Sequence, residues 1–93
     1  MIKHCSEKEL DLFYKSIISI ETKEECEAFL EDICTIKEIT AMAQRLTVAK
    51  LLNSGKTFNE IVECTGASTA TISRVNRSLN YGKGYKHILN KIK

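Results

Sequence analysis

The sequence contains no proline and no tryptophan, and only four of its 93 residues are glycine. It also has no apolar run close to the ~20 residues that span a bilayer, and no signal-peptide pattern at its start. Its β-branched residues recur at helical rather than alternating spacing, which predicts an all-α protein. We therefore expect one helical domain over residues 1–93, located in the cytoplasm.

Closely paired cysteines are absent as well. The four cysteines form no C-x-x-C pair, and the two histidines lie near opposite ends of the sequence. Zinc sites usually take their ligands from such pairs, so we expect no metal and interpret the cysteines as small buried hydrophobic residues in a reducing compartment. No nucleophile–base pair is visible, and we expect neither an enzyme nor a cofactor. The cysteines are Cys5, Cys26, Cys34 and Cys64.

Acidic residues are missing from the last third of the chain. No acid follows Glu63, whereas six basic residues do. Residues 1–43 contain five lysines and ten acids (net −5), and residues 44–93 contain nine basic and two acidic residues (net +7). A charge run is often only a solvated face, but this segregation also suits a protein whose basic end faces a polyanion.

Four helix starts are predicted by a repeated signal, a Ser or Thr followed three residues later by Glu. This pattern is the capping box. The signal predicts helices over residues 7–20, 23–33 and 36–53, and a last helix follows a break at residues 80–84. The apolar stripes in residues 10–20 and 36–52 are wider than one packing partner needs, which favours a dimer. The four expected boxes are Ser6–Glu9, Thr22–Glu25, Thr35–Glu38 and Thr57–Glu60.

The stretch from Lys56 to Leu79 reads KTFNEIVECTGASTATISRVNRSL and predicts two short helices around one glycine. Gly66 can take the positive φ that a chain needs when it leaves a helix. Ser68 can cap the second helix, in which apolar residues recur at spacings of three and four. This is the sequence form of a helix-turn-helix, at about residues 57–80. The apolar residues that we interpret as its scaffold are Ile72, Val75 and Leu79.

The outward face of the second helix offers hydroxyls, an amide and two guanidinium groups, with no acid among them. Hydroxyl and guanidinium groups donate to phosphates, and arginine can also bind guanine with two parallel N–H groups. A solvated amphipathic helix is the plainer alternative. The absence of acid favours DNA binding.

Two resemblances point the same way. GASTATISRVNR looks like the helix-turn-helix of bacterial repressors, and LLNSGKTFNEIVECTGASTATISRVNRSL resembles the core of the Trp repressor family, including its YerC/YecD branch. The similarity is clearest over residues 44–79 and continues collinearly over residues 36–92. It implies a six-helix fold, an intertwined homodimer whose remaining helices form the dimerisation core, and a transcription regulator that binds a near-palindromic operator on double-stranded DNA.

Matching residues to the family motif gives a set of candidate DNA contacts. Thr69, Ala70 and Arg74 are expected to face base edges, with Ala70 offering only a methyl group. The remaining candidates are expected to contact phosphates or to flank the groove. They are Ser68, Thr71, Ser73, Arg77 and Asn80 for phosphates, and Lys56 and Thr57 for the flank.

The same matching predicts that tryptophan is not the effector. In the Trp repressor, one arginine covers the indole, a glycine leaves room at its other face, and a second arginine takes the carboxylate. Here the carboxylate position is kept as Arg74, but the other two are Gln44 and Val75. Gln offers a weaker cover and Val overfills the slot, while Arg45 should be turned about 100° away from it. Whether another small molecule acts as effector stays open.

A second function agrees with the same sequence. The chain can be a helical protein-interaction module that keeps the helix-turn-helix shape without binding DNA, with its acidic N-terminal half as the docking surface. Salt-dependent DNA affinity separates the two hypotheses.

Overall fold

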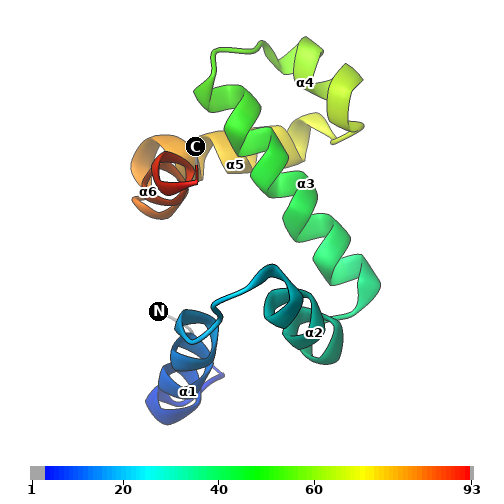
Figure 1. Cartoon of the computed structure of the whole chain (residues 1–93). Coiled ribbons are helices and arrows are strands. Elements are labelled where there is room, and N and C mark those ends of the chain that lie inside the picture. The colour runs from blue at the N-terminus through cyan, green and yellow to red at the C-terminus, as the bar shows by residue number, and fades with distance from the viewer. Residues whose placement is uncertain (1–3, 93) are drawn as a thin grey trace. The chain divides into compact units, whose positions relative to one another are not determined.

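The protein is described by a computed structural model over residues 4–92, and this part of the chain consists of six α-helices without a strand (Figure 1). The all-α class and the number of helices are as predicted. The first helix stops two residues earlier than the sequence predicts, and the fifth extends through Asn80, the first residue of the predicted break. The helices are α1 (Glu7–Ile18), α2 (Lys23–Ile33), α3 (Ile36–Asn53), α4 (Phe58–Thr65), α5 (Thr69–Tyr81) and α6 (Gly84–Lys91).

Capping boxes start α1 and α4 as predicted. The amide of Glu9 donates to Ser6 Oγ over 3.2 Å, and the Glu9 carboxylate accepts from the Ser6 amide over 3.3 Å. Thr57 and Glu60 make the same pair of bonds at 3.2 and 2.9 Å. Both hydrogen bonds of the capping box are therefore present in each of the two helices.

The expected box at α2 forms only in part. Thr22 accepts the amide of Glu25 over 3.1 Å, but the Glu25 carboxylate accepts from the amide of Glu21 over 3.0 Å. The glutamate thus reaches one residue beyond the cap, where another free amide is available. Helix α3 begins directly after Thr35, the residue predicted to cap it.

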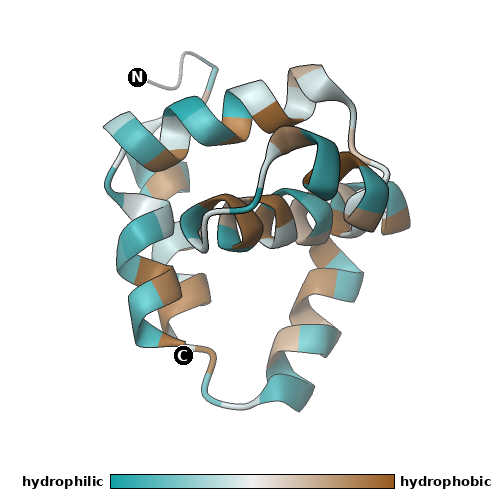
Figure 2. Ribbon diagram, turned by 90° about the horizontal axis from the view of Figure 1, so that it is seen from above, coloured by the Kyte–Doolittle hydropathy of each residue, from teal (hydrophilic) through white to brown (hydrophobic). Residues whose placement is uncertain are grey.

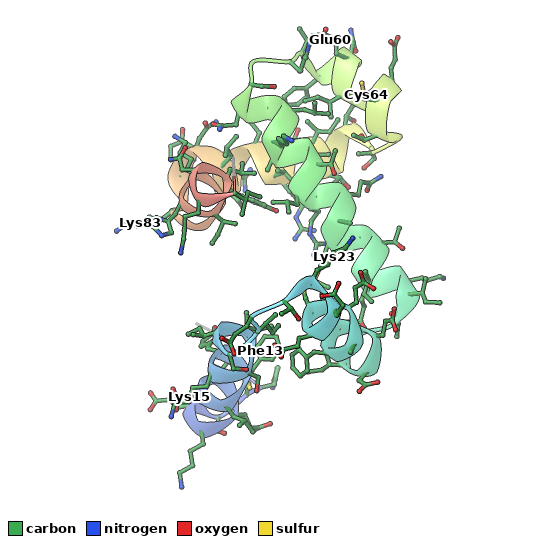
Figure 3. All side chains as sticks on the ribbon, viewed as in Figure 1. Phe13, Lys15, Lys23, Glu60, Cys64 and Lys83 are labelled. Atoms are coloured by element: carbon green, nitrogen blue, oxygen red, sulfur yellow. The ribbon has the colours of Figure 1, made fainter. Side chains whose placement is uncertain are left out.

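The chain divides into two compact units, with the boundary between Thr35 and Ile36. In the first unit, none of the residues of α1 and α2, all of which the structure describes, is buried. Apolar side chains of α1 are instead open to solvent, with Leu12 68% and Ile18 80% exposed. Figure 3 shows Phe13 on this helix, with its ring centroid 6.1 Å from that of Tyr14.

The second unit contains α3 to α6 and has a core. Helix α5 contacts α3, α4 and α6, and α3 contacts α4 and α6 as well (Figure 1). Apolar residues line the faces where these helices meet (Figure 2). The predicted scaffold is confirmed, because Ile72, Val75 and Leu79 are at most 3% exposed. The other buried residues are Val48, Ala49, Ile61, Ala67 and Leu89.

The cysteines differ from their expected burial. All four thiols are free, but Cys5, Cys26 and Cys34 are only half-buried and Cys64 is exposed (Figure 3). Cys26 and Cys34 belong to the first unit, which has no buried helix residue among those described. Cys64 is exposed although it lies only three residues after the core residue Ile61 of the same helix.

Within the described residues, no helix is both long enough and apolar enough to cross a membrane.

Candidate nucleic-acid interface

The turn into α4 is set by a glycine. Gly55 has φ +91°, its amide donates to the carbonyl of Leu52 over 3.0 Å, and the Lys56 amide donates to the carbonyl of Leu51 over 3.1 Å. This pair of bonds is the Schellman motif, which satisfies free carbonyls at a helix C-terminus. The motif ends α3 and brings Lys56 and Thr57, both exposed, to the start of α4.

Helix α4 ends at Gly66, whose φ of +70° is the left-handed conformation predicted for this position. The Gly66 amide donates to the carbonyl of Val62 over 2.8 Å. Two further residues, buried Ala67 and exposed Ser68, connect this cap to α5. The helix-turn-helix predicted from residues 56–79 is therefore present, with a turn of three residues.

The outer face of α5 has the chemistry expected from the sequence. None of residues 69–81, all of which are described, is acidic. The three base-edge candidates, Thr69, Ala70 and Arg74, are exposed and lie in the first half of the helix. The phosphate candidates Ser73 and Arg77 are exposed too, one and two turns into the helix. The helix thus presents hydroxyl and guanidinium donors on a rigid support.

Some candidate hydroxyls already have partners. Ser68 Oγ accepts the amide of Thr71 over 3.1 Å and donates to Thr71 Oγ1 over 3.1 Å. Thr71 is itself half-buried against α3 instead of facing fully outward. Thr57 Oγ1 is likewise occupied as a cap for α4. The caps of Thr57 and Ser68 are as predicted, and the bond between the Ser68 and Thr71 hydroxyls was not expected.

Asn80 lies on the last turn of α5, where it is exposed. Its Nδ2 donates to Oδ1 of Asn76 over 3.2 Å. Asn76 was absent from the candidate set, although its four-residue spacing from Asn80 was a signal that could have found the pair. Beyond it, Gly82 ends the helix, and a Cβ there would lie only 2.7 Å from the carbonyl oxygen of Ser78. The close approach explains why a glycine stands at this position.

At the start of α4, the capping box stabilises the ionised form of the Glu60 carboxylate. The Thr57 backbone amide, and then its side chain, donate to the Glu60 carboxylate and lower the pKa of that group from its ordinary value of 4.5, with a smaller contribution from Lys56. Glu60 lies on the exposed outer surface of α4 (Figure 3).

A small hollow of about 100 Å³ lies between α3 and α5. Its walls include Gln44 and Arg74, two of the positions matched to the Trp repressor effector site. Arg45 also lines it, so the expected turn of about 100° does not take this side chain out of the hollow. The complete lining is Ala41, Gln44, Arg45, Thr71 and Arg74.

Gln44 has a second contact that sequence reasoning did not reveal. Its Nε2 donates to the carbonyl oxygen of Thr65 over 3.2 Å, across 21 positions of the chain. Thr65 is the last residue of α4. Because this bond joins residues far apart in the sequence, local spacing gave no indication of it.

The fold and the exposed face together define a helix-turn-helix protein of the kind that binds DNA. The family model "Trp repressor protein" matches residues 8–93 of the chain. The uncharacterised protein YerC of Bacillus subtilis (strain 168) is 53% identical over 87 residues, which cover 92% of this chain and 84% of YerC.

Two solved structures have the same fold. One is a candidate Trp repressor from Staphylococcus aureus, 44% identical, with a TM-score of 0.89 over 94% of this chain and 88% of the other. The second is a TrpR-like protein from Eubacterium eligens ATCC 27750, 45% identical, with a TM-score of 0.89 over 94% and 91% of the two chains. The chain belongs to the Trp repressor family, a family of helix-turn-helix DNA-binding transcription regulators rather than of enzymes.

Proposed function

We propose that the protein is a sequence-specific regulator that binds a near-palindromic operator as a homodimer. The observation that carries this proposal is the exposed face of α5, which contains no acidic residue. The opposite face of the same helix is buried through Ile72, Val75 and Leu79. The first half of α5 would enter the major groove, so that Thr69, Ala70 and Arg74 meet base edges. Because a DNA-binding regulator must reach the chromosome, the proposal includes a cytoplasmic location.

Contacts to the DNA backbone complete the proposed interface. Arg77 and Asn80 lie farther along α5, and Ser73 directly precedes Arg74. Lys56 and Thr57, just before α4, would flank the groove. In this arrangement Ser68 and Thr71 contribute mainly by capping α5, since their hydroxyls bond to each other. Free amides at the start of a helix also favour an adjacent phosphate.

The dimer is supported by apolar surface that the single chain leaves uncovered. Besides Leu12 and Ile18 on α1, Ile36 at the start of α3 is 84% exposed and Ile92 after α6 is 61% exposed. A groove lined by Leu46, Gly84, Tyr85 and Ile88 adds an open apolar surface between α3 and α6. A second copy would remove these side chains from water, at roughly 25 cal/mol per Å² of apolar area.

Direct titration tests DNA binding. A fluorescent duplex of random sequence should bind, and the logarithm of its association constant should fall linearly with the logarithm of salt concentration, with a slope of about −0.9 for each phosphate neutralised. The rival function, a protein-interaction module docking through its acidic half, predicts no measurable DNA affinity even at low salt. Sedimentation equilibrium at micromolar concentration tests the dimer, and a well-packed monomer there would remove the basis for a palindromic site.

We further propose that tryptophan is not the effector. Val75 is 2% exposed and packs in the core, so that the side chain fills the space where the family's effector site has a bare backbone. The Gln44 amide donates to Thr65 and is not free to cover an indole. Arg45 is the remaining candidate cover, because it lines the hollow.

Isothermal titration calorimetry with L-tryptophan up to millimolar concentration decides this second part. We expect no saturable heat. A micromolar dissociation constant, accompanied by tighter DNA binding, would contradict the proposal, and loss of that signal in Arg45→Ala would show which side chain replaces the missing arginine.

A further inference from the structure

The connection between α4 and α5 is held by an amide from a third helix. Gln44 lies in the middle of α3, and its Nε2 donates to the carbonyl oxygen of Thr65 over 3.2 Å. The last carbonyls of a helix have no partner within it, and a side chain from elsewhere can satisfy one of them. The partner here is neutral, so the bond ties α3 to the end of α4 without adding charge near the DNA.

Thr65 is also the residue on which the turn is built. Its hydroxyl donates to the carbonyl of Ile61 over 2.7 Å and accepts the amide of Ala67 over 3.1 Å. Gly66 occupies the left-handed region, and Ala67 is only 3% exposed. The positions of residues 65 to 67 therefore set the direction in which the chain enters α5.

The same amide lies beside the first half of α5. Gln44 lines the hollow between α3 and α5 together with Thr71 and Arg74. Arg74 is one of the three residues proposed to face base edges. A change in how α4 ends against α3 would move this half of α5 relative to the groove, and contacts to base edges require close geometry.

We infer that Gln44 is a positioning residue for DNA reading. Its amide fixes the end of α4 to α3, and through the turn it fixes the angle at which α5 presents Thr69, Ala70 and Arg74. The inference rests on the proposed DNA-binding function and concerns the geometry of the reading helix. Gln44 itself need not touch the DNA.

A purely stabilising bond makes a different prediction. If Gln44 only strengthened the fold, its loss would lower the midpoint of urea unfolding and leave the folded protein's preference for its operator unchanged. A positioning residue acts on the ratio of specific to non-specific affinity, because phosphate contacts tolerate a tilt of α5 that base-edge contacts do not.

The test uses the full chain and the duplex most enriched from a random pool, with a shuffled duplex of the same composition as the non-specific probe. Gln44→Met keeps the length and neutrality of the side chain but has no N–H donor. We expect the specific-to-non-specific ratio to fall roughly three- to thirtyfold, a range typical of mutations that alter coupling between elements. Affinity for the shuffled duplex should change by less than about twofold, since its phosphate contacts remain.

A second variant and a matched control complete the experiment. Gln44→Leu also removes the N–H donor and adds no charge beside Arg74, which lines the same hollow, so it should lower the ratio as well. Thr47→Val removes another side-chain hydrogen bond of α3, the 3.0 Å bond from Thr47 to the carbonyl of Ala43, which stays within the helix. That control should leave the ratio unchanged.

The possible outcomes distinguish failure of DNA binding from failure of the positioning role of Gln44. If the wild-type protein shows no preference for any duplex, both the proposed function and this inference fail. If the wild-type protein prefers its duplex and the Gln44 variants that fold keep the full ratio, only the positioning role is overturned.

Discussion

The two units of the chain use the same local signals but differ in packing. Helix α1 in the first unit and α4 in the second both begin with a complete capping box, and both carry an apolar stripe. Ile61 of α4 is fully buried, whereas none of the residues of α1, all described by the structure, is buried. Capping thus determines where a helix starts, while burial depends on whether another helix of the chain covers its stripe.

Charge follows the same division. Basic residues concentrate in the second unit, which carries the reading helix, and acids concentrate on α1 and α2. The exposed apolar residues of the first unit lie on these acidic helices. This division motivates the proposal that the second unit carries the DNA-reading helix on its own core and that the first unit forms the dimer contacts.

The largest expected effect comes from removing packing inside the second unit. Ile72→Ala deletes part of a side chain with no exposed surface on α5. Such deletions cost about 2–5 kcal/mol, through lost transfer energy and the cavity left behind. Urea unfolding followed by circular dichroism measures the loss. A change below about 0.5 kcal/mol, the size of an ordinary surface substitution, would show that this core is not what supports α5.

The same substitution in the first unit should act on assembly. Ile18 is 80% exposed in the single chain, so Ile18→Ala leaves no cavity there. If α1 packs against a second copy, the change should weaken dimerisation by about 1–3 kcal/mol, as truncation of a buried interface residue does. Sedimentation equilibrium over a range of concentrations gives the dissociation constant. An unchanged constant would place the dimer interface away from α1.

Two arginines on α5 test how the second unit reads DNA. Arg74→Ala should cost about 1–3 kcal/mol of specific binding and relax the base preference, whereas Arg77→Ala should weaken binding on all duplexes and reduce the salt slope by about one. Both are exposed and stand one helical turn apart, which makes them matched controls for each other. Identical effects on specific and shuffled duplexes would remove the distinction between base and phosphate contacts.

The smallest expected effect concerns the capping box of α4, a motif that also starts α1 in the first unit. The unfolded Glu60 carboxyl titrates near 4.5, and the Thr57 amide lowers its folded-state pKa below that value. The resulting stabilisation is present above pH 4.5 and is lost as pH falls through the folded pKa. Glu60→Gln can keep the box but cannot titrate. The wild-type urea midpoint should therefore fall more steeply than that of the variant between pH 6 and pH 3, and parallel curves would contradict this account.

The sequence predicted what depends on local spacing. The starts of α1, α2, α3 and α4, the left-handed Gly66 and the buried stripe of α5 all follow from residues within four positions of one another. Helix ends were less accurate: α5 extends through Asn80, whose side chain bonds to Asn76, and ends at Gly82.

Contacts between distant residues could not be predicted. The bond from Gln44 to Thr65 and the half-buried position of Thr71 beside α3 depend on how α3 crosses the helix-turn-helix. The same holds for Arg45, which was expected to turn away from the hollow but lines it. In the first unit, the apolar stripe of α1 is exposed in the single chain. That a second copy covers it stays a prediction.

Selection of bound sequences from a random duplex pool tests the central claim most directly. The account predicts enrichment of a near-palindromic motif whose half-sites lie about one helical turn apart, roughly 34 Å, as a two-fold symmetric pair of α5 helices requires. Enrichment should lose its base preference when Arg74→Ala protein is used. A pool that stays unenriched at low salt, or one that yields a single asymmetric half-site, would contradict a dimeric reader built on α5.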